Sequence, residues 1–123
     1  MTKNTNAVVW AEIPVSNLAK GRAFYEAILQ VTMKPEQMGP MATAVFPYDS
    51  DVAVSGHIYE GPTAGDGRGP AVSLRVEGDL PAAMARVSEA GGQVISDVIP
   101  IPAGEFFYVI DPDGNRLSLF KAA

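Results

Sequence analysis

The chain has 123 residues, 47% of them apolar, which suits one compact domain with a real hydrophobic core and excludes extensive disorder. Its formal net charge of −5 argues against a nucleic-acid surface or an anionic membrane as partner, because both attract clustered Lys and Arg. The lack of cysteine excludes disulfides and cysteine-held metals, and no run approaches the roughly 20 apolar residues of a membrane span, so a cytoplasmic protein is expected.

The first half of the chain predicts a strand, a helix and two more strands. Residues 7–15 form the first strand and end in "VSNL", where Ser16 or Asn17 can cap a helix. This helix ends before Pro35, and its apolar positions fall roughly on one side: Leu18, Phe24, Tyr25, Ile28 and Leu29. Short strands are expected at residues 41–46 and 52–59, separated by the turn-forming "PYDSD".

A stretch rich in glycine and proline, "EGPTAGDGRGP" at residues 60–70, separates the two halves. It has no apolar periodicity, which is typical of a linker or a mobile loop. We therefore divide a single domain, residues 1–123, into module one (1–60), a linker (61–69) and module two (70–123).

The second half repeats the order of elements found in the first. A strand at residues 71–76 precedes a helix with Asp79 as N-cap and Pro81 in its first turn. Leu80, Ala83, Met84 and Val87 have the spacing of one buried helical stripe, which Gly91-Gly92 ends.

A strand at residues 93–98 and a hairpin complete the second half. The hairpin pairs residues 106–110 with 117–120 around "DPDGN", in which Asp111 and Asp113 are expected to be turn residues. Each half thus indicates a βαβββ unit, and the sequence predicts an α+β protein with a duplicated module.

The segments "EIPVSNLAKGRAFYEAIL", "LRVEGDLPAAMARVSEAGGQV" and "FFYVIDPDGNRLSLF" resemble, in order and spacing, the vicinal oxygen chelate superfamily, also called the glyoxalase/bleomycin resistance/dioxygenase superfamily. The resemblance covers nearly the whole chain. It implies two βαβββ modules that form a curved, cup-like mixed sheet with the helices outside. It also implies a homodimer, and a concave face that holds a small-molecule ligand and, in many members, a divalent metal.

Metal-dependent members place His, Gln or Glu on the first strand of each module and Glu on the last. The positions that correspond in this chain are Trp10, Ala71 and Ser118. None is a strong metal ligand, and a transition-metal site needs about three or more converging N, O or S donors. The expectation is therefore that no metal and no other cofactor is bound, and that Ser118 faces the cup where a carboxylate would otherwise lie.

Strand alternation places Trp10 and Glu12 on one face, which the resemblance makes the concave one. An aromatic wall beside a carboxylate suits a ligand with an apolar body and one hydrogen-bond donor or cation. In the alternative, Trp10 fills a closed core and Glu12 pairs with Arg75 of module two. The two readings have equal weight.

His57, the only histidine, shares a strand face with Ser55 and Tyr59. Either His57 and Tyr59 line the cup opposite Ser118, or the histidine lies on the convex or dimer-facing side. Near the start of the closing hairpin, one of Phe106 and Phe107 must face the cup while the other packs under a helix. The ligand-binding candidates are therefore Trp10, Glu12, His57, Tyr59, Phe107 and Ser118.

Three classes of function are compatible with these residues. The favoured class is a small-molecule-binding protein that uses the cup without the family's usual metal. The second is a metal-dependent lyase, isomerase or dioxygenase with unusual ligands such as His57, Glu12 and Glu105. The third is a structural or regulatory dimer whose cup is filled by side chains. The sequence names no substrate, no catalytic residue and no ligand.

Overall fold

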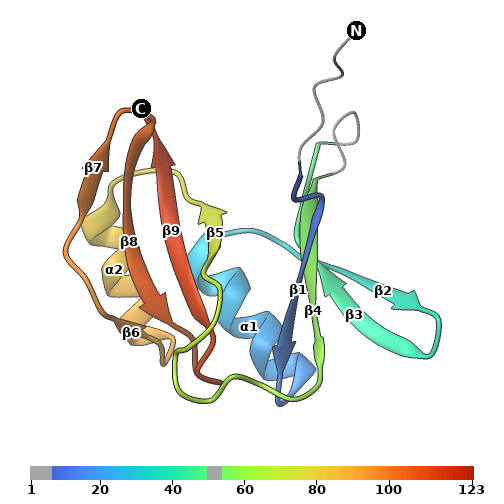
Figure 1. The fold of residues 1–123 in the computed structure, drawn as a ribbon. Coiled ribbons are helices and arrows are strands. Elements are labelled where there is room, and N and C mark those ends of the chain that lie inside the picture. The colour runs from blue at the N-terminus through green and yellow to red at the C-terminus, as the bar shows by residue number, and fades with distance from the viewer. Residues whose placement is uncertain (1–6, 50–53) are drawn as a thin grey trace, which may run out of the picture.

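The computed structural model describes residues 7–49 and 54–123, which contain two helices and nine strands. The first half runs β1 (Trp10–Val15), α1 (Leu18–Leu29), β2 (Lys34–Met38), β3 (Met41–Val45) and β4 (Ser55–Glu60) (Figure 1). The second half runs β5 (Val72–Arg75), α2 (Leu80–Glu89), β6 (Gln93–Val94), β7 (Ile99–Ile101), β8 (Gly104–Ile110) and β9 (Arg116–Ala122). The predicted α+β class is confirmed. Neither helix within these ranges is long and apolar enough to cross a membrane.

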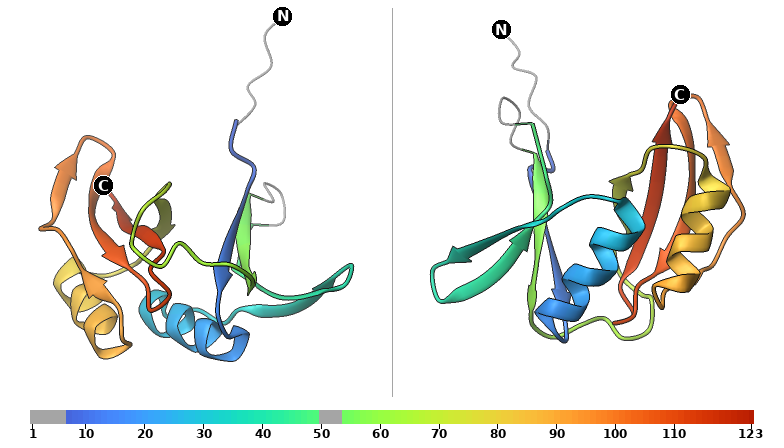
Figure 2. Two further views of the ribbon diagram at one scale, coloured as in Figure 1. Left: turned by 60° about the horizontal axis from the view of Figure 1, so that its bottom comes forward. Right: turned by 180° about the vertical axis from the view of Figure 1, so that it is seen from behind.

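The strands form two mixed sheets with the same plan, one from each half. The first has the order β1-β4-β3-β2 and the second the order β5-β9-β8-β6, with β7 also pairing β8. In each sheet the opening strand runs parallel to the closing strand, β1 to β4 and β5 to β9. The two sheets share no strand, and they stand apart in both views of Figure 2. Among the described residues, β1 and β5 lie at the ends of their sheets.

The strand expected at residues 93–98 is broken into β6 and β7, which pair with opposite ends of β8. The break has a local cause. The Tyr108 backbone N–H donates to the Ser96 hydroxyl at 2.8 Å, so a side chain takes the place of a ladder carbonyl between the two short strands.

Helix α1 packs between the two sheets (Figure 1). It begins where the Asn17 side chain accepts from the Lys20 N–H at 2.9 Å, and it ends at Gln30, which has left-handed dihedrals. Its stripe of Phe24, Tyr25 and Ile28 is buried.

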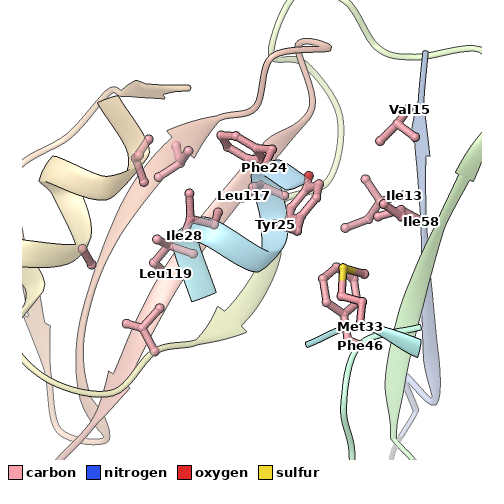
Figure 3. Close-up of a cluster of buried hydrophobic side chains, with 14 of the residues drawn as sticks. Ile13, Val15, Phe24, Tyr25, Ile28, Met33, Phe46, Ile58, Leu117 and Leu119 are labelled. Carbon is pink, nitrogen blue, oxygen red and sulfur yellow. The ribbon is translucent and has the colours of Figure 1, made fainter. Parts of the chain in front are cut away.

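The core is one cluster that surrounds this helix. Figure 3 shows Ile13, Val15 and Ile58 approaching α1 from the first sheet, and Leu117 and Leu119 from the second. Because Ile13 and Val15 point toward α1, the alternate residues of β1 point away from it.

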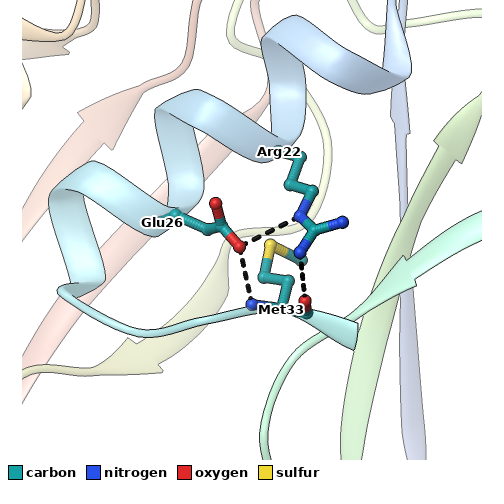
Figure 4. Close-up of polar contacts among 3 residues, drawn as sticks. All are labelled: Arg22, Glu26 and Met33. Atoms are coloured by element: carbon teal, nitrogen blue, oxygen red, sulfur yellow. Dashed lines mark hydrogen bonds and ion pairs between the residues drawn. The ribbon is translucent and has the colours of Figure 1, made fainter. Parts of the chain in front are cut away.

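The turn from α1 into β2 is held by an ion pair and two backbone contacts (Figure 4). The Glu26 carboxylate accepts from the Met33 N–H at 2.8 Å and from Arg22 Nε at 3.0 Å, while Arg22 Nη2 donates to the Met33 carbonyl at 2.6 Å. The Met33 hydrogen bond, and after it the Arg22 hydrogen bond, lower the pKa of Glu26.

A buried polar network joins the two halves at the closing hairpin. The Tyr25 hydroxyl of α1 donates to Asp111 Oδ2 at 2.6 Å, and Asn115 Nδ2 donates both to the same carboxylate at 2.9 Å and to the Pro14 carbonyl of β1 at 2.7 Å. Burial first, and then the Asp111 charge, raise the pKa of Tyr25 well above its usual value. The turn residue Asp111 thus connects segments that are 86 positions apart.

The linker lies against the same hairpin turn. The Gly65 N–H donates to the Asp113 carbonyl at 3.2 Å and the Gly67 N–H to the Gly114 carbonyl at 2.7 Å. Gly114 has φ +83°, and a Cβ there would lie 2.3 Å from the Gly65 carbonyl carbon, so only glycine permits this approach. Backbone hydrogen bonds thus hold Gly65 and Gly67 against the turn of the closing hairpin.

Candidate functional site

Trp10, Glu12 and His57 lie together on the face of the first sheet that points away from α1. In the parallel pairing of β1 with β4, Glu12 is the register partner of His57, and Ile13 is the partner of Ile58. Since Ile13 and Ile58 are in the core, the Glu12 and His57 side chains point to the opposite face.

His57 is held by one defined hydrogen bond. Trp10 Nε1 lies 2.8 Å from His57 Nδ1. An indole nitrogen can only donate, so Nδ1 is the acceptor and the imidazole proton is assigned to Nε2. The tryptophan thereby sets both the tautomer and the orientation of the histidine ring.

The other nitrogen of the ring is buried and unpaired. His57 is 3% exposed, and Nε2 has no hydrogen-bond partner among the described residues. Glu12 Oε1 is 3.4 Å from it, close enough for an ion pair with a protonated imidazole but without the geometry of a hydrogen bond. The Glu12 side chain itself is 58% exposed. A solvent-facing carboxylate therefore stands beside an unsatisfied buried donor.

Four aromatic rings follow one another along this face. Ring centroids are 6.0 Å apart for Tyr48 and Trp10, 6.0 Å for Trp10 and His57, and 5.9 Å for His57 and Tyr59. We call Tyr48, Trp10, His57 and Tyr59 the aromatic row. The first and last pairs are edge-to-face, with interplanar angles of 77° and 70°, so adjacent rings present faces in different directions.

Sequence reasoning missed Tyr48 as a member of this row. This residue lies in the loop after β3, and the direction of a loop side chain cannot be predicted from strand alternation. One signal was available. This loop leaves the strand whose last residue, Val45, is the register partner of His57, so the first residues beyond it start close to the histidine.

Ser118 and Phe107 belong to the second sheet and not to this cluster. Ser118 is buried on the side away from Leu117 and Leu119, and its hydroxyl is 2.6 Å from that of Ser73. Phe107 is fully buried in the core around α1. The choice of Phe107 as the cup-facing ring is therefore wrong: it is paired with the core residue Leu119, and Phe106 takes the other face.

The donors at this face do not fit the family's divalent metal. The positions expected to hold it carry an indole, a methyl group and a hydroxyl at Trp10, Ala71 and Ser118. Glu12 and His57 supply two donors, fewer than the three or more that such a site needs. No group of three His, Cys, Asp or Glu side chains that could hold a metal occurs in residues 7–49 and 54–123.

The alternative ion pair between Glu12 and Arg75 is also not found in the described part of the chain, where the charged contact of Glu12 is to His57.

A cavity of about 900 Å³ lies between the two modules. Ala11 and Gly56, register partners two residues before Ile13 and Ile58, are both small and line it. Its other walls include Val31, Phe46, Val72 and Leu74. None of the six predicted ligand residues lines this cavity, but Tyr48 of the aromatic row does, so the cavity borders the row at that residue.

Comparisons with known proteins agree with this fold. The model of the Glyoxalase/Bleomycin resistance protein/Dioxygenase superfamily matches residues 7–119. Curated relatives include the "Putative glyoxylase CFP32" of Mycobacterium bovis and of Mycobacterium tuberculosis, each 29% identical over 124 residues. Those matches cover 100% of this chain and 47% of the relative, so the chain spans about half the length of the curated relatives it matches.

Solved structures with the same fold include a glyoxalase/bleomycin resistance protein from Albidiferax ferrireducens, with a TM-score of 0.67, 18% identity and coverage of 94% of this chain and 98% of that one. A glyoxalase-related enzyme from Fulvimarina pelagi has a TM-score of 0.65 and 17% identity, and the match covers 95% of this chain and 88% of that chain. With the family match over residues 7–119, the chain belongs to the Glyoxalase/Bleomycin resistance protein/Dioxygenase superfamily.

Proposed function

We propose that this chain binds a small molecule at the face formed by Trp10, Glu12 and His57, without the divalent metal that many members of its family use. The observation that carries the proposal is the buried, unpaired Nε2 of His57 beside the exposed Glu12 carboxylate. An unsatisfied buried donor costs about 1–3 kcal/mol, so one that persists calls for an explanation. A bound group that completes the hydrogen bonding here would supply one.

The chemistry of the face supports binding rather than metal-assisted catalysis. Trp10 is half-buried and Tyr59 is also partly exposed, so apolar ring surface is available beside the carboxylate. Small-molecule sites commonly combine such apolar walls with a few placed polar groups. A metal-dependent lyase, isomerase or dioxygenase has less support, because Glu12 and His57 supply two metal ligands and such a site needs about three or more.

We also propose that the protein acts as a homodimer. Support comes from β1 and β5, which end their sheets in the described residues, so that each module has an edge strand with which a second copy could pair. Light scattering on the purified chain tests this proposal: a molar mass twice that of one chain is expected, and a monomer at all concentrations would refute it. The cytoplasmic location expected from the sequence stays a prediction.

The binding proposal is tested by a thermal-shift screen of a chemically diverse metabolite and antibiotic library, with elemental analysis of the same preparation. We expect at least one compound to raise the melting temperature of the wild type and not that of Trp10→Leu. The matched control is Tyr108→Leu, an aromatic residue of the second sheet, which should leave the shift unchanged. Stoichiometric zinc, iron, nickel or manganese, or compounds that stabilise Trp10→Leu equally, would contradict the proposal.

A further inference from the structure

We infer that the ligand of this face carries a permanent positive charge on nitrogen, as in a quaternary or fully methylated ammonium group, together with an oxygen that can accept from His57 Nε2, as the hydroxyl of choline can. This inference rests on the proposed small-molecule binding and narrows it to one chemical class. Its basis is the juxtaposition of the aromatic row with the carboxylate of Glu12.

The aromatic row is suited to a diffuse cation. The face of an aromatic ring has negative electrostatic potential and attracts a cation placed within about 6 Å of its centroid, most strongly at tryptophan. Trp10 is second in the row and contacts Tyr48 at an interplanar angle of 77° and His57 at 49°. Tyr48 is exposed and Trp10 and Tyr59 are partly exposed, whereas His57 is 3% exposed, so the ring surface open to a cation is that of Trp10 and the two tyrosines.

The indole N–H is not available to a ligand. Trp10 Nε1 donates to His57 Nδ1, so the tryptophan offers ring surface and no hydrogen-bond donor. An anionic ligand would therefore find no donor on Trp10, and at the unpaired donor His57 Nε2 it would meet the negative charge of Glu12, whose Oε1 is 3.4 Å away.

Among residues 7–49 and 54–123, no lysine or arginine forms an ion pair with the Glu12 carboxylate. Its charged contact is with His57, whose neutral tautomer is the one set by Trp10. The arginine ion pairs within the described ranges are Arg22 with Glu26 and Arg68 with Asp66, and no Lys or Arg in those ranges pairs with Glu12. An exposed, uncompensated carboxylate beside electron-rich rings attracts positive charge.

The number of acceptors selects among cations. A primary ammonium group carries three N–H donors and is best bound where several acceptors converge. Here the Glu12 carboxylate is the acceptor that the described residues place beside His57, and the nearest nitrogen, His57 Nε2, is itself a donor. A methylated ammonium has no N–H to satisfy, and its charge is spread over methyl groups that pack on ring faces. A metal cation is disfavoured by the short donor set.

The test is a fluorescence titration of the wild-type protein with choline and with 3,3-dimethylbutan-1-ol, which has the same shape but carbon in place of the charged nitrogen. Trp10 is the only tryptophan, so its emission reports this site directly. We expect choline to change the emission saturably, and the neutral alcohol to bind about fivefold to thirtyfold more weakly.

Two variants complete the design. Glu12→Gln keeps the size of the side chain and removes its charge, so it should weaken choline binding about tenfold while leaving the alcohol unaffected. Glu89→Gln, an exposed glutamate at the end of α2, is the matched control and should change neither titration.

Three results would overturn the inference. Equal binding of choline and the alcohol, or a neutral or anionic library compound that changes Trp10 emission while choline does not, would refute the cation class and leave the binding site standing. If no compound of the library changes the emission, the proposed function fails and the inference fails with it.

Discussion

Removing the Asp111 carboxylate should destabilise the protein far more than a turn substitution normally does. Asp111 is 3% exposed and accepts four hydrogen bonds: from the Tyr25 hydroxyl, from the N–H groups of Asp113 and Asn115, and from Asn115 Nδ2. Asp111→Ala leaves these donors without their acceptor. We expect a loss of about 3–5 kcal/mol in the free energy of unfolding.

Tyr25→Phe removes one of the four donors and leaves the carboxylate with three, so its expected cost is about 1.5 kcal/mol, in the range for a hydrogen bond to a charged group. In an Asp111→Ala background the same change should cost less than about 0.5 kcal/mol, because the partner is already gone. Urea unfolding followed by circular dichroism measures the free energy of unfolding of the wild type, the two single variants and the double variant, which together form a double-mutant cycle.

The matched control is Tyr108→Phe. Tyr108 is a partly exposed tyrosine whose ring lies under Arg116, and this change should stay within about 0.5 kcal/mol of the wild type. If Asp111→Ala does not fold, Asp111→Asn replaces it in the cycle. Equal costs of Tyr25→Phe in both backgrounds would refute the buried network as a link between the modules.

Three further predictions concern pH, backbone and metal. Because the pKa of Tyr25 is raised by folding, the stabilising effect of this tyrosine is complete below the pKa of unfolded tyrosine, about 10, and is lost as pH rises toward the folded pKa. The free energy of unfolding should therefore fall above about pH 10, and more steeply in the wild type than in Tyr25→Phe. Identical pH profiles of the two proteins would contradict this. Gly114→Ala should cost about 1–3 kcal/mol in urea unfolding, and more than Gly39→Ala, which shares a positive φ but has no atom within 4 Å of the added Cβ; equal costs would show that the linker contact is unimportant. EDTA should leave the melting temperature unchanged, whereas a marked fall that zinc or manganese restores would show that the metal-ligand positions are misplaced.

The local sequence pattern predicted helices and strands well where neighbouring residues alone determine the structure. Asp79 caps α2 as predicted, and of the two candidates Ser16 and Asn17 it is Asn17 that caps α1. Alternation along β1 placed Trp10 and Glu12 on one face, because side-chain direction in a strand depends only on parity.

Parity alone could not decide between Phe106 and Phe107. Both are phenylalanine, so the pattern showed that they point to opposite faces and not which face is buried. The pairing of Phe107 with Leu119 decides it, and that pairing depends on the register of the whole hairpin.

Contacts between distant segments were also beyond local pattern. Asp111 looked like a turn residue, and it is one, but its acceptance of the Tyr25 hydroxyl depends on α1 packing against the hairpin. The contact of Tyr48 with Trp10 likewise depends on the path of a loop. The separation of the modules into two sheets reflects α1 between them, a tertiary arrangement that the repeated strand order does not specify.

The measurement that tests the central proposal most directly is the NMR signal of the Trp10 indole N–H. The chain has one tryptophan, so it gives one indole resonance, and that proton is donated to His57. We predict that compounds which stabilise the protein shift this resonance, and that Glu12→Gln reduces the shift for cationic ones. The proposal would be contradicted if the indole signal stayed unchanged while the methyl signals of Val72 and Leu74 moved, since binding would then take place in the cavity between the modules.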